Sequence, residues 1–401
     1  MASSSIGSPT PLPVLRASEN WGTIGTVPTG KVWIVSDASA ANMSGISNPV
    51  SLRYLDASNS NAPTNILPTA ALALSTTLQM MTRSKMLSAG DILQGKCTTS
   101  TFGTKSETMG ATMSARALAY DGTTLMVVGA LGQVATTTDL GNNWSTLDLG
   151  TASTLTALAS GATGEFVTHD GANFRSSSNS GASFTTRTAA SFTCNKIIWC
   201  AALSLYIAVG SGGNIWTAPA GGATWTSRSS GVSVSLNDVA FNGTTALAVG
   251  AVAPTNGASC TTTNGTTWVA NNSGTAQSFL AVEYCSGLSA FMVMLANLAY
   301  TTTDGITYTA RQAPVSGTPQ GIVTNGSEFA TITNTGGGTY SALAATPVTR
   351  ALSASPSQCK PIYAASKYLW ASGSFLYSCP SFNAAGSMAV DMSVSVVEMS
   401  A

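Results

Sequence analysis

The sequence predicts an all-β protein in which a jelly-roll-like β-sandwich precedes a β-propeller of six or seven blades. Three observations lead to this fold class. A polar turn that ends in an aromatic residue recurs about every 40 residues, apolar strand-length segments separated by glycine-containing turns fill each repeat, and no segment shows the 3.6-residue period of a capped helix. The 401 residues are enough for two or three domains.

The repeated turn sets the period of the chain. It first occurs as TTTDLGNNW at 136–144, and its later copies are SSSNSGASF, TAPAGGATW, TTTNGTTW and TTTDGITY. The terminal aromatic residues are spaced by 40, 41, 43 and 40 residues, and a degenerate copy, TNTGGGTY, follows after 32 more. Periods near 40 with strand-like content are typical of propeller blades.

Each repeat contains four expected strands. Asp-Gly or Asn-Gly pairs, as in Asp121-Gly122 and Asn242-Gly243, predict tight hairpins between the first and second strands. The second strands, LMVVG, YIAVG and LAVGA, are continuously apolar, as in strands that are buried on both faces. Six units are counted between 116 and 363, and the segment 363–382 begins a seventh, which makes seven blades the prediction and six the alternative.

The repeated turn is predicted to be structural. Its Thr or Ser and its Asp or Asn can bond backbone donors, its Gly supplies a positive φ, and its aromatic ring is expected to pack back into its own blade. The turn positions are Thr137, Asp139, Gly141, Trp144, Ser177, Asn179, Gly181, Phe184, Thr217, Gly221, Trp225, Thr262, Asn264, Gly265, Trp268, Thr302, Asp304, Gly305 and Tyr308.

These residues resemble the Asp-box, S/T-x-D-x-G-x-x-W, of sialidase-like propellers. The first copy, from Thr137 to Trp144, matches in full, the copies at 262–268 and 302–308 are one residue short, and Pro219 replaces the acid of the third. The resemblance covers about 116–345. It implies the propeller fold and no catalytic role, because in that family the boxes lie away from the ligand-binding face.

The two ends of the chain lack the repeat. Residues 1–113 read as six to eight strands with Gly, Pro and Asn turns, hence a β-sandwich for docking or oligomerisation. Their pattern of turns resembles the small jelly-roll modules of tail, fibre and decoration proteins of tailed bacteriophages. The propeller is expected over 114–387, and the alternating segment 388–401 is expected either to close the propeller or to return to the sandwich.

Composition excludes several classes of protein. Only 8% of residues are charged, against roughly 25% in average globular chains, and 16 basic residues balance 16 acidic ones. No basic surface is therefore expected to attract nucleic acid. The start shows no signal peptide, and the apolar window 279–300 is interrupted by polar residues, so that two strands and a turn are expected there rather than a membrane span. The seven cysteines match no metal motif and are expected to be buried, although Cys194 with Cys200, or Cys359 with Cys379, could bridge.

No catalytic, metal or cofactor site is predicted. Sialidase chemistry needs an arginine cluster and paired acids, whereas the repeats hold few of either, and Arg175, Arg187 and Arg228 flank the repeated turns. The single histidine, His169, is expected in a solvated turn. Candidate ligand-face aromatics, which as strand residues are also suited to packing inside the blades, are Trp199, Trp216, Tyr284, Tyr300 and Trp370.

The functional expectation is a non-enzymatic virion protein of a tailed phage, assembled in the bacterial cytoplasm. Its N-terminal domain would contact other virion proteins, copies would form a trimer or ring, and the propeller would face a host-surface glycan or protein. The alternative is a propeller glycoside hydrolase or a lectin-like glycan-binding protein. A third reading, a bacterial assembly factor or adhesin, would normally carry an export signal.

Overall fold

The computed structural model describes residues 10–11, 15–16, 22–29, 31–42, 48–60, 62–72, 77–79, 85–87, 89, 91–97, 101–102, 104–109, 113–253, 256–296, 298–311, 318–334, 336–343, 348–352, 359–379 and 390–400. Over these residues the secondary structure consists of strands and five 3₁₀ turns, with no α-helix, as the sequence predicts. The turns are η1 (Ala57–Asn59), η2 (Ala130–Gly132), η3 (Ala201–Leu203), η4 (Ser211–Gly213) and η5 (Ala220–Gly222). None of the described residues forms a helix that could span a membrane.

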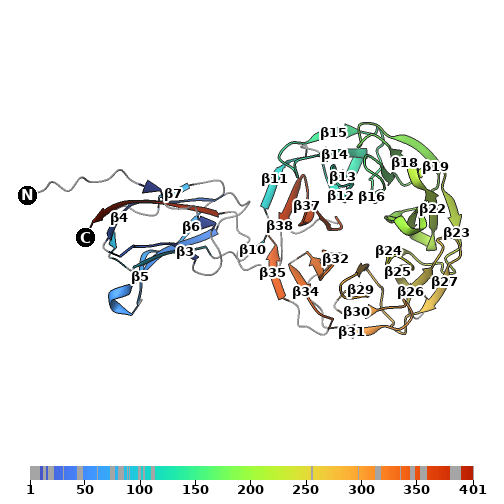
Figure 1. The fold of residues 1–401 in the computed structure, drawn as a ribbon. Coiled ribbons are helices and arrows are strands. Elements are labelled where there is room, and N and C mark those ends of the chain that lie inside the picture. The colour runs from blue at the N-terminus through green and yellow to red at the C-terminus, as the bar shows by residue number, and fades with distance from the viewer. Residues whose placement is uncertain are drawn as a thin grey trace, which may run out of the picture. The chain divides into compact units, whose positions relative to one another are not determined.

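The larger part of the chain is a seven-bladed propeller, which confirms the favoured blade count (Figure 1). Blades one to three are β12 (Ala115–Tyr120), β13 (Leu125–Gly129), β14 (Gln133–Thr137) and β15 (Ser145–Asp148); β16 (Leu158–Ser160), β17 (Phe166–His169), β18 (Asn173–Ser177) and β19 (Thr185–Ala189); and β20 (Cys194–Cys200), β21 (Leu205–Gly210), β22 (Ile215–Pro219) and β23 (Thr226–Arg228). Each blade is an antiparallel meander whose first strand lies innermost.

Blades four to six repeat this order. They are β24 (Leu236–Phe241), β25 (Ala246–Ala253), β26 (Asn256–Thr262) and β27 (Val269–Asn272); β28 (Ala281–Cys285), β29 (Ala290–Met294), β30 (Ala299–Thr302) and β31 (Thr309–Arg311); and β32 (Pro319–Thr324), β33 (Phe329–Thr333), β34 (Gly337–Tyr340) and β35 (Val348–Leu352). The apolar window 279–300 is therefore β28, a turn and β29, followed by the start of β30.

The seventh blade closes the ring with a strand from an earlier part of the chain. Its sheet order is β11 (Thr104–Thr108), β38 (Phe375–Cys379), β37 (Lys367–Ser372) and β36 (Ile362–Ala364). Because β11 is the outer strand of this blade, the compact propeller unit begins at Ser106 and ends at Phe382. The sequence-based boundary at 113/114 places β11 with the N-terminal residues.

The other compact unit combines both ends of the chain, Met1–Lys105 and Asn383–Ala401. One of its sheets is β3 (Gly22–Thr26), β9 (Ile92–Cys97), β5 (Asn48–Asp56) and β6 (Ala62–Leu72). The other holds β1 (Thr10–Pro11), β39 (Val390–Ser400), β4 (Lys31–Asn42) and β7 (Thr77–Gln79), with β2 (Leu15–Arg16) and β8 (Lys85–Leu87); β10 (Thr101–Phe102) follows in the chain. The tail strand β39 pairs antiparallel with β4 from Val390↔Asn42 to Ser400↔Lys31.

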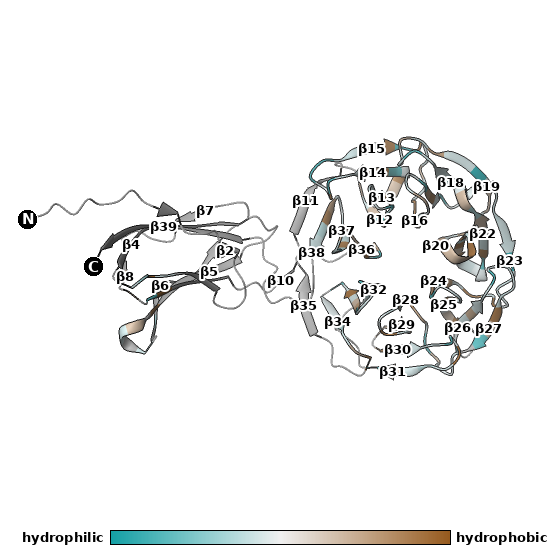
Figure 2. Ribbon diagram, in the orientation of Figure 1, coloured by the Kyte–Doolittle hydropathy of each residue, from teal (hydrophilic) through white to brown (hydrophobic). Residues whose placement is uncertain are grey.

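The propeller core lies between the blades rather than within one of them. Among the described residues, six clusters of buried side chains each join two neighbouring blades. Second strands such as β13, β29 and β33 are buried at every residue, as predicted, while outer strands such as β19 are largely exposed and hydrophilic (Figure 2). Neighbouring blades are therefore held together mainly by burial of apolar surface.

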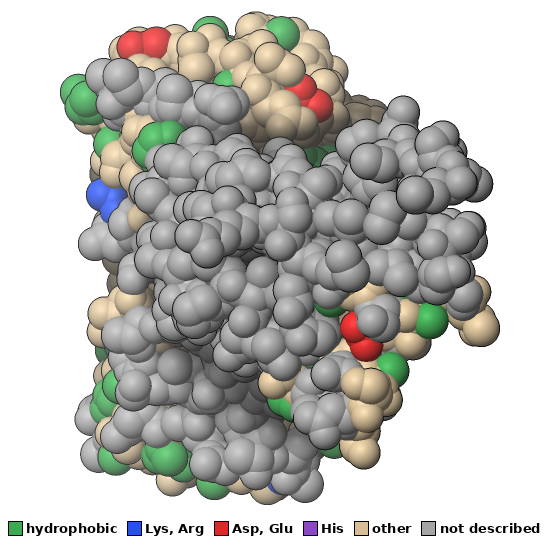
Figure 3. All heavy atoms as spheres, turned by 90° about the vertical axis from the view of Figure 1, so that its left-hand side faces the viewer, with side chains coloured by type: hydrophobic (Ala, Val, Ile, Leu, Met, Phe, Trp, Pro, Cys, Tyr) green, Lys and Arg blue, Asp and Glu red, His purple; other side chains and the backbone are tan. Residues whose placement is uncertain are grey.

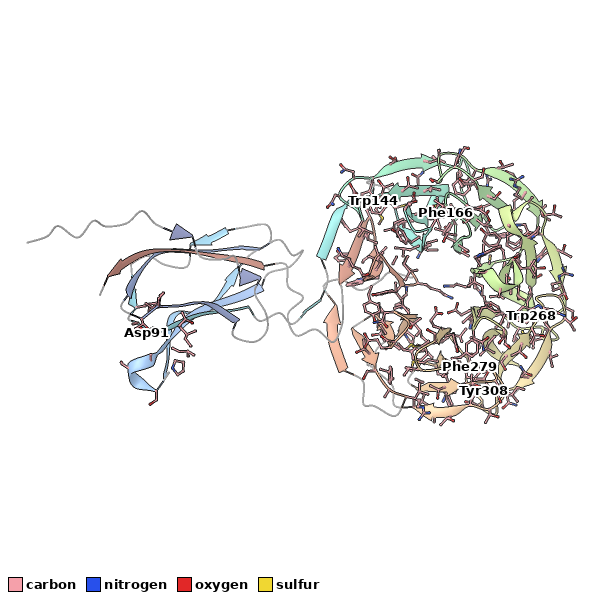
Figure 4. The ribbon with its side chains drawn as sticks, viewed as in Figure 1. Asp91, Trp144, Phe166, Trp268, Phe279 and Tyr308 are labelled. Carbon is pink, nitrogen blue, oxygen red and sulfur yellow. The ribbon has the colours of Figure 1, made fainter. Side chains whose placement is uncertain are left out.

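The aromatic residue of each repeated turn packs against the preceding blade, which corrects the expectation that it packs into its own. Trp225 of blade three stacks on Phe174 of blade two, with ring centroids 3.7 Å apart and planes 4° apart. Trp144, Trp268 and Tyr308, marked in Figure 4, likewise join the clusters shared with the blade before them. In a closed propeller each blade presents apolar surface to its neighbour. The aromatic side chain is buried in that contact between blades.

Candidate functional site

The repeated turns use their polar side chains to bond their own backbone. In the first, Thr137 Oγ1 donates to Asp139 Oδ1 (2.7 Å) and accepts from the Gly141 N–H (3.1 Å). Asp139 Oδ1 also accepts from the Asn143 N–H (2.9 Å), and this hydrogen bond is the main cause of the lowered pKa of Asp139. The same pattern recurs at Ser177, Thr262 and Thr302. These side chains are occupied locally, and the turns serve the fold.

The third turn lacks the acid and obtains one from the neighbouring blade. Glu165, between β16 and β17, accepts from the Gly221 N–H at 2.7 Å. The same Oε1 accepts a hydrogen bond from the buried Tyr206 hydroxyl. Thr217 accepts from Arg228 Nε at 2.9 Å, as Ser176 accepts from Arg187 in the preceding blade. Glu165 therefore supplies a carboxylate from the neighbouring blade to a turn that has none of its own.

The candidate ligand-face aromatics lie in three different blades and each packs against other rings or a core cluster. Trp199 contacts Tyr206, Trp216 contacts Phe174 and Phe192, and Tyr284 contacts Phe291. Tyr300 joins the cluster between blades four and five. Trp370 on β37 is completely buried against Tyr377, so it offers no surface to a ligand.

Most arginines and acids of the repeats have partners outside the central channel. Arg175 forms an ion pair with Asp170 (2.7 Å), and Arg187 and Arg311 donate to hydroxyl groups one strand inward. Glu328 accepts from the Tyr368 hydroxyl at 2.9 Å. Cys194 and Cys200 are both free and buried, so that pairing does not form, and burial raises the pKa of the Cys200 thiol to about 12. In the described part of the chain, no three His, Cys, Asp or Glu side chains gather as metal ligands.

His169 is fully buried, whereas the sequence suggested a solvated turn. Its ring lies 4.7 Å from both Phe174 and Phe192. The Gly171 N–H donates to Nδ1 (3.0 Å), which leaves Nε2 as the donor to the Ala190 carbonyl (2.9 Å). Desolvation lowers the pKa of His169 from its ordinary value of 6.5. Both the packing and the hydrogen bonds therefore favour the neutral ring.

Acidification should destabilise the propeller through this one histidine. Below about pH 6.5 the unfolded chain binds a proton that the folded chain does not, so the free energy of unfolding should fall by at most about 1.4 kcal/mol per pH unit until the lowered folded pKa is reached. Urea unfolding of a Glu283→Gln variant between pH 5 and 8 measures this slope. In the wild-type chain Glu283, whose pKa burial raises to about 7, takes up a proton over the same range and opposes the effect of His169. Because the chain has a single histidine, its NMR signal provides the control: free titration near pH 6.5 in the folded protein would contradict the assignment.

A ring of side chains at one mouth of the central channel emerges from the inner strands. In four blades the register between the first two strands shifts by one residue, at Arg116, Asn195, Asn237 and Gln320. A bulged residue of this kind is re-aimed away from the ladder. The corresponding residues of the other blades also directly follow a buried residue, and the seven ring positions are Arg116, Thr156, Asn195, Asn237, Leu280, Gln320 and Lys360. All seven are partly exposed.

Three ring positions connect each blade to the next one. Thr156 Oγ1 donates to the Cys194 carbonyl (2.5 Å), Asn195 Nδ2 to the Leu236 carbonyl (2.8 Å), and Asn237 Nδ2 to the Phe279 carbonyl (2.8 Å). Each acceptor directly precedes the ring position of the following blade. These bonds fix the mouth of the channel over blades two to five.

Lys360 instead crosses the channel, from blade seven to blade four. Its Nζ donates to the Asn237 carbonyl (2.7 Å) and lies 3.0 Å from Asp238 Oδ1. Asp238 is buried and also accepts from the backbone N–H groups of Val239 and Val282. Desolvation lowers the pKa of Lys360, and Asp238 partly offsets that effect. Figure 4 shows side chains reaching into the opening between the inner strands.

The ring encloses a cavity of about 360 Å³, lined by Arg116, Thr154, Thr156, Asn195, Asn237 and Lys360. Lys196 lines a narrow space that continues from it. Glu283, on β28, interacts electrostatically with Lys196, Lys360 and Asp238, and burial raises its pKa to about 7. Three cations, Arg116, Lys196 and Lys360, thus line these spaces, and two acids, Asp238 and Glu283, interact with the lysines. The channel mouth is therefore a cationic, polar cavity in a chain that is otherwise poor in charged residues.

Sequence reasoning missed this site although the signal was present. The sequence has no known motif at Asn195, Lys196, Asp238 or Lys360, and their shared position is visible only when the blades are aligned with one another. Aligned by their inner strands, the blades read RAL, TAL, NKI, NDV, LAV, QGI and KPI, a column that is polar in six blades of seven. A polar residue at the start of a buried strand, recurring once per blade, indicates a shared position on the ring axis.

Comparison with known proteins supports the fold alone. No family model and no curated protein matches the sequence. Among solved structures, the chain is similar to YCF48 bound to a D1 peptide, with a TM-score of 0.55 and 10% identity over 69% of this chain and 95% of that one. It is also similar to virginiamycin B lyase from Staphylococcus aureus, with a TM-score of 0.53 and 10% identity over 69% and 98% of the two chains. At this identity the likeness concerns the propeller and not its activity.

Proposed function

We propose that this chain is a non-enzymatic structural protein of a tailed-phage particle that displays its propeller for contact with a ligand on the host surface or on a neighbouring subunit. One observation carries the proposal. The propeller is inserted into the other compact unit, because the chain leaves that unit at Lys105 and returns to it at Asn383, where β39 pairs with β4 along its length. A module held at both ends by one unit is suited to display.

The composition and the repeated turns support this proposal. The polar surface is built mainly from uncharged side chains, and on the face drawn in Figure 3 the described atoms include few charged groups. Such a surface repels copies of itself weakly, which suits assembly into a particle. The turns, which resemble Asp-boxes, use their polar side chains in hydrogen bonds within the turn. We therefore place the contact with a ligand at the channel mouth. The first unit, a β-sandwich in this proposal, would dock to the particle or form the trimer or ring.

Mass spectrometry of purified particles tests the role directly. The protein should be present in stoichiometric amounts, and light scattering should give the recombinant chain the mass of a trimer or a larger ring. A monomer that is absent from particles would refute the structural role.

A second candidate, a propeller glycoside hydrolase, is favoured by one feature, the proximity of Glu283 and Asp238 in the channel. Hydrolysis by two carboxyl groups needs one as an acid and the other as a base or nucleophile. Asp238 already binds Lys360 and two backbone N–H groups, which argues against that use. Release of reducing sugar from host polysaccharide by the wild-type chain, lost in Glu283→Gln, would favour the hydrolase.

A further inference from the structure

We propose that a groove on the outer wall of the propeller, between blades one and two, binds an uncharged sugar. The groove has a volume of about 430 Å³ and is lined mainly by β14, β15 and the repeated turn of blade one, together with residues 179–182 in the turn of blade two. It shares no residue with the cavity at the channel mouth. The inference therefore adds a second, separate site and does not depend on the function proposed above.

An exception in the repeat opens this groove. In blades two to five, the third residue after the aromatic of the repeated turn bonds a hydroxyl group on the neighbouring strand. The pairs are Arg187 Nε with Ser176 Oγ (2.8 Å), Arg228 Nε with Thr217 Oγ1 (2.9 Å), Asn271 Nδ2 with Thr261 Oγ1 (3.1 Å) and Arg311 Nε with Thr301 Oγ1 (2.9 Å). Blade one has Leu147 at this position, and no side chain of the described residues bonds the hydroxyl group of Thr136. Leu147 and Thr136 both line the groove, so the space that a longer polar side chain covers in the other blades is open here.

Hydroxyl and amide groups make up most of the lining. The hydroxyl-bearing residues whose side chains are partly or fully exposed are Thr136, Thr138, Ser145, Thr146 and Ser180. Asn143 donates its side-chain amide to Asp139 Oδ2 at 2.7 Å, which leaves its Oδ1 as an acceptor. A ligand with several hydroxyl groups can bond these donors and acceptors, whereas a purely apolar ligand would leave them without a partner.

The groove also has an apolar part. It is formed by Trp144, which Figure 4 marks, and by Leu147 and Val134, and the first two of these side chains are only partly buried. The C–H groups on one face of a pyranose ring can pack against such a surface while its hydroxyl groups bond the polar lining. A volume of about 430 Å³ also lies within the range of small-molecule sites. The mixture of polar and apolar lining therefore favours a sugar.

The charge of the groove disfavours an anion. Asp139 is the only ionisable residue of its lining, and hydrogen bonds from Asn143 and Thr137 lower the pKa of Asp139, so its carboxylate stays ionised. Both of its oxygens accept from groups of the same turn. The carboxylate of an acidic sugar would be repelled here, because no lysine or arginine belongs to the lining. We therefore assign the groove to a sugar without charge.

NMR titration of the full chain with four neutral sugars tests the proposal. The probes are D-glucose, D-galactose, D-mannose and N-acetyl-D-glucosamine. At least one of them should bind with a Kd of about 1–10 mM and should shift the indole N–H signal of Trp144, which a Trp144→Phe variant identifies. Absence of binding by all four sugars, or binding that leaves this signal unmoved, would overturn the proposal.

Two variants that obstruct the groove test its location. Leu147→Arg gives blade one the residue that three other blades carry at this position, where it should reach Thr136 as Arg187 reaches Ser176 and weaken binding about tenfold or more. Asn271→Arg is the matched control, because it places the same side chain at the equivalent position of blade four and should leave the affinity unchanged. Ser145→Tyr changes an exposed residue of the lining and should weaken binding even if Leu147→Arg folds poorly. Full affinity in Ser145→Tyr, or an equal loss in Asn271→Arg, would refute the placement.

Further ligands test the chemical class. D-glucuronate and D-galacturonate should each bind more weakly than the corresponding neutral hexose, because Asp139 repels their carboxylates. Acetyl-trialanine amide, an uncharged peptide, should bind more weakly than the tightest of the four sugars. Tighter binding of a uronate or of the peptide would overturn the uncharged sugar as the ligand. Mass spectrometry of particles tests the structural role separately from all of these results.

Discussion

Gly210→Ala is expected to lower the free energy of unfolding of the propeller by about 3 kcal/mol or more. Gly210 ends β21, and a Cβ there would lie 2.0 Å from the Thr193 carbonyl oxygen and 2.7 Å from the Phe192 ring. The backbone cannot easily yield, because the Ser211 N–H donates to that same carbonyl at 3.0 Å. The φ of Gly210 is −175°, so steric overlap and not a left-handed conformation causes the loss.

The close approach recurs around the ring, which makes the expectation general. Gly129 at the end of β13 and Gly250 within β25 hold the equivalent position, and a Cβ at each would lie 2.3 Å and 2.1 Å from the Ser114 and Ser235 carbonyl oxygens. Each site includes the same hydrogen bond from the residue after the glycine, at 3.1 Å and 2.8 Å. Gly250→Ala should therefore cost about as much as Gly210→Ala.

Chemical denaturation followed by tryptophan fluorescence measures the loss. Gly171→Ala is the matched control, because Gly171 has a φ of +88° and open space around a Cβ. It should cost about 1–2 kcal/mol, the ordinary strain of a left-handed alanine. A Gly210 variant no less stable than the Gly171 variant would show that the strands approach less closely than described.

Periodicity made the blade count and the buried second strands predictable from sequence. The spacing of Trp144, Phe184 and Trp225 reports the repeat directly, and tight Asn-Gly and Asp-Gly turns report the hairpins. The pattern fails where a contact joins different repeats. Trp225 packs on Phe174 of the preceding blade, and Glu165 bonds the Gly221 N–H of the next blade. The sequence of one repeat does not indicate its partner in another.

The ends of the chain and the channel show the same limit. That β11 belongs to the seventh blade follows from ring closure, which no local propensity encodes. His169 is the last residue of β17, beside a polar turn, yet it packs against Phe192 and bonds the Ala190 carbonyl. Likewise the meeting of Lys360 with Asp238 spans more than a hundred residues and depends on seven blades closing into one ring.

The ion pair between Lys360 and Asp238 leads to the second large prediction. Asp238→Ala is expected to lower the free energy of unfolding by about 3–5 kcal/mol. The substitution leaves Lys360 in the channel without its carboxylate, and it removes the acceptor of the Val239 and Val282 N–H groups. Asp148→Ala is the control, since that exposed side chain accepts from a single N–H of Gly150 and its loss should cost about 1 kcal/mol.

A double-mutant cycle with Lys360→Met separates the ion pair from the backbone bonds. In the Asp238→Ala background, Lys360→Met no longer leaves a buried carboxylate without its ion-pair partner. The double variant should therefore be more stable than the sum of the two single losses predicts, by about 1–3 kcal/mol. Val239 and Val282 keep their unsatisfied N–H groups in both backgrounds, and that part of the loss should persist. Strict additivity would mean that blades four and seven are not coupled across the channel. The bridge would then contribute nothing to ring closure, and the stability of the ring would come from the contacts between neighbouring blades alone.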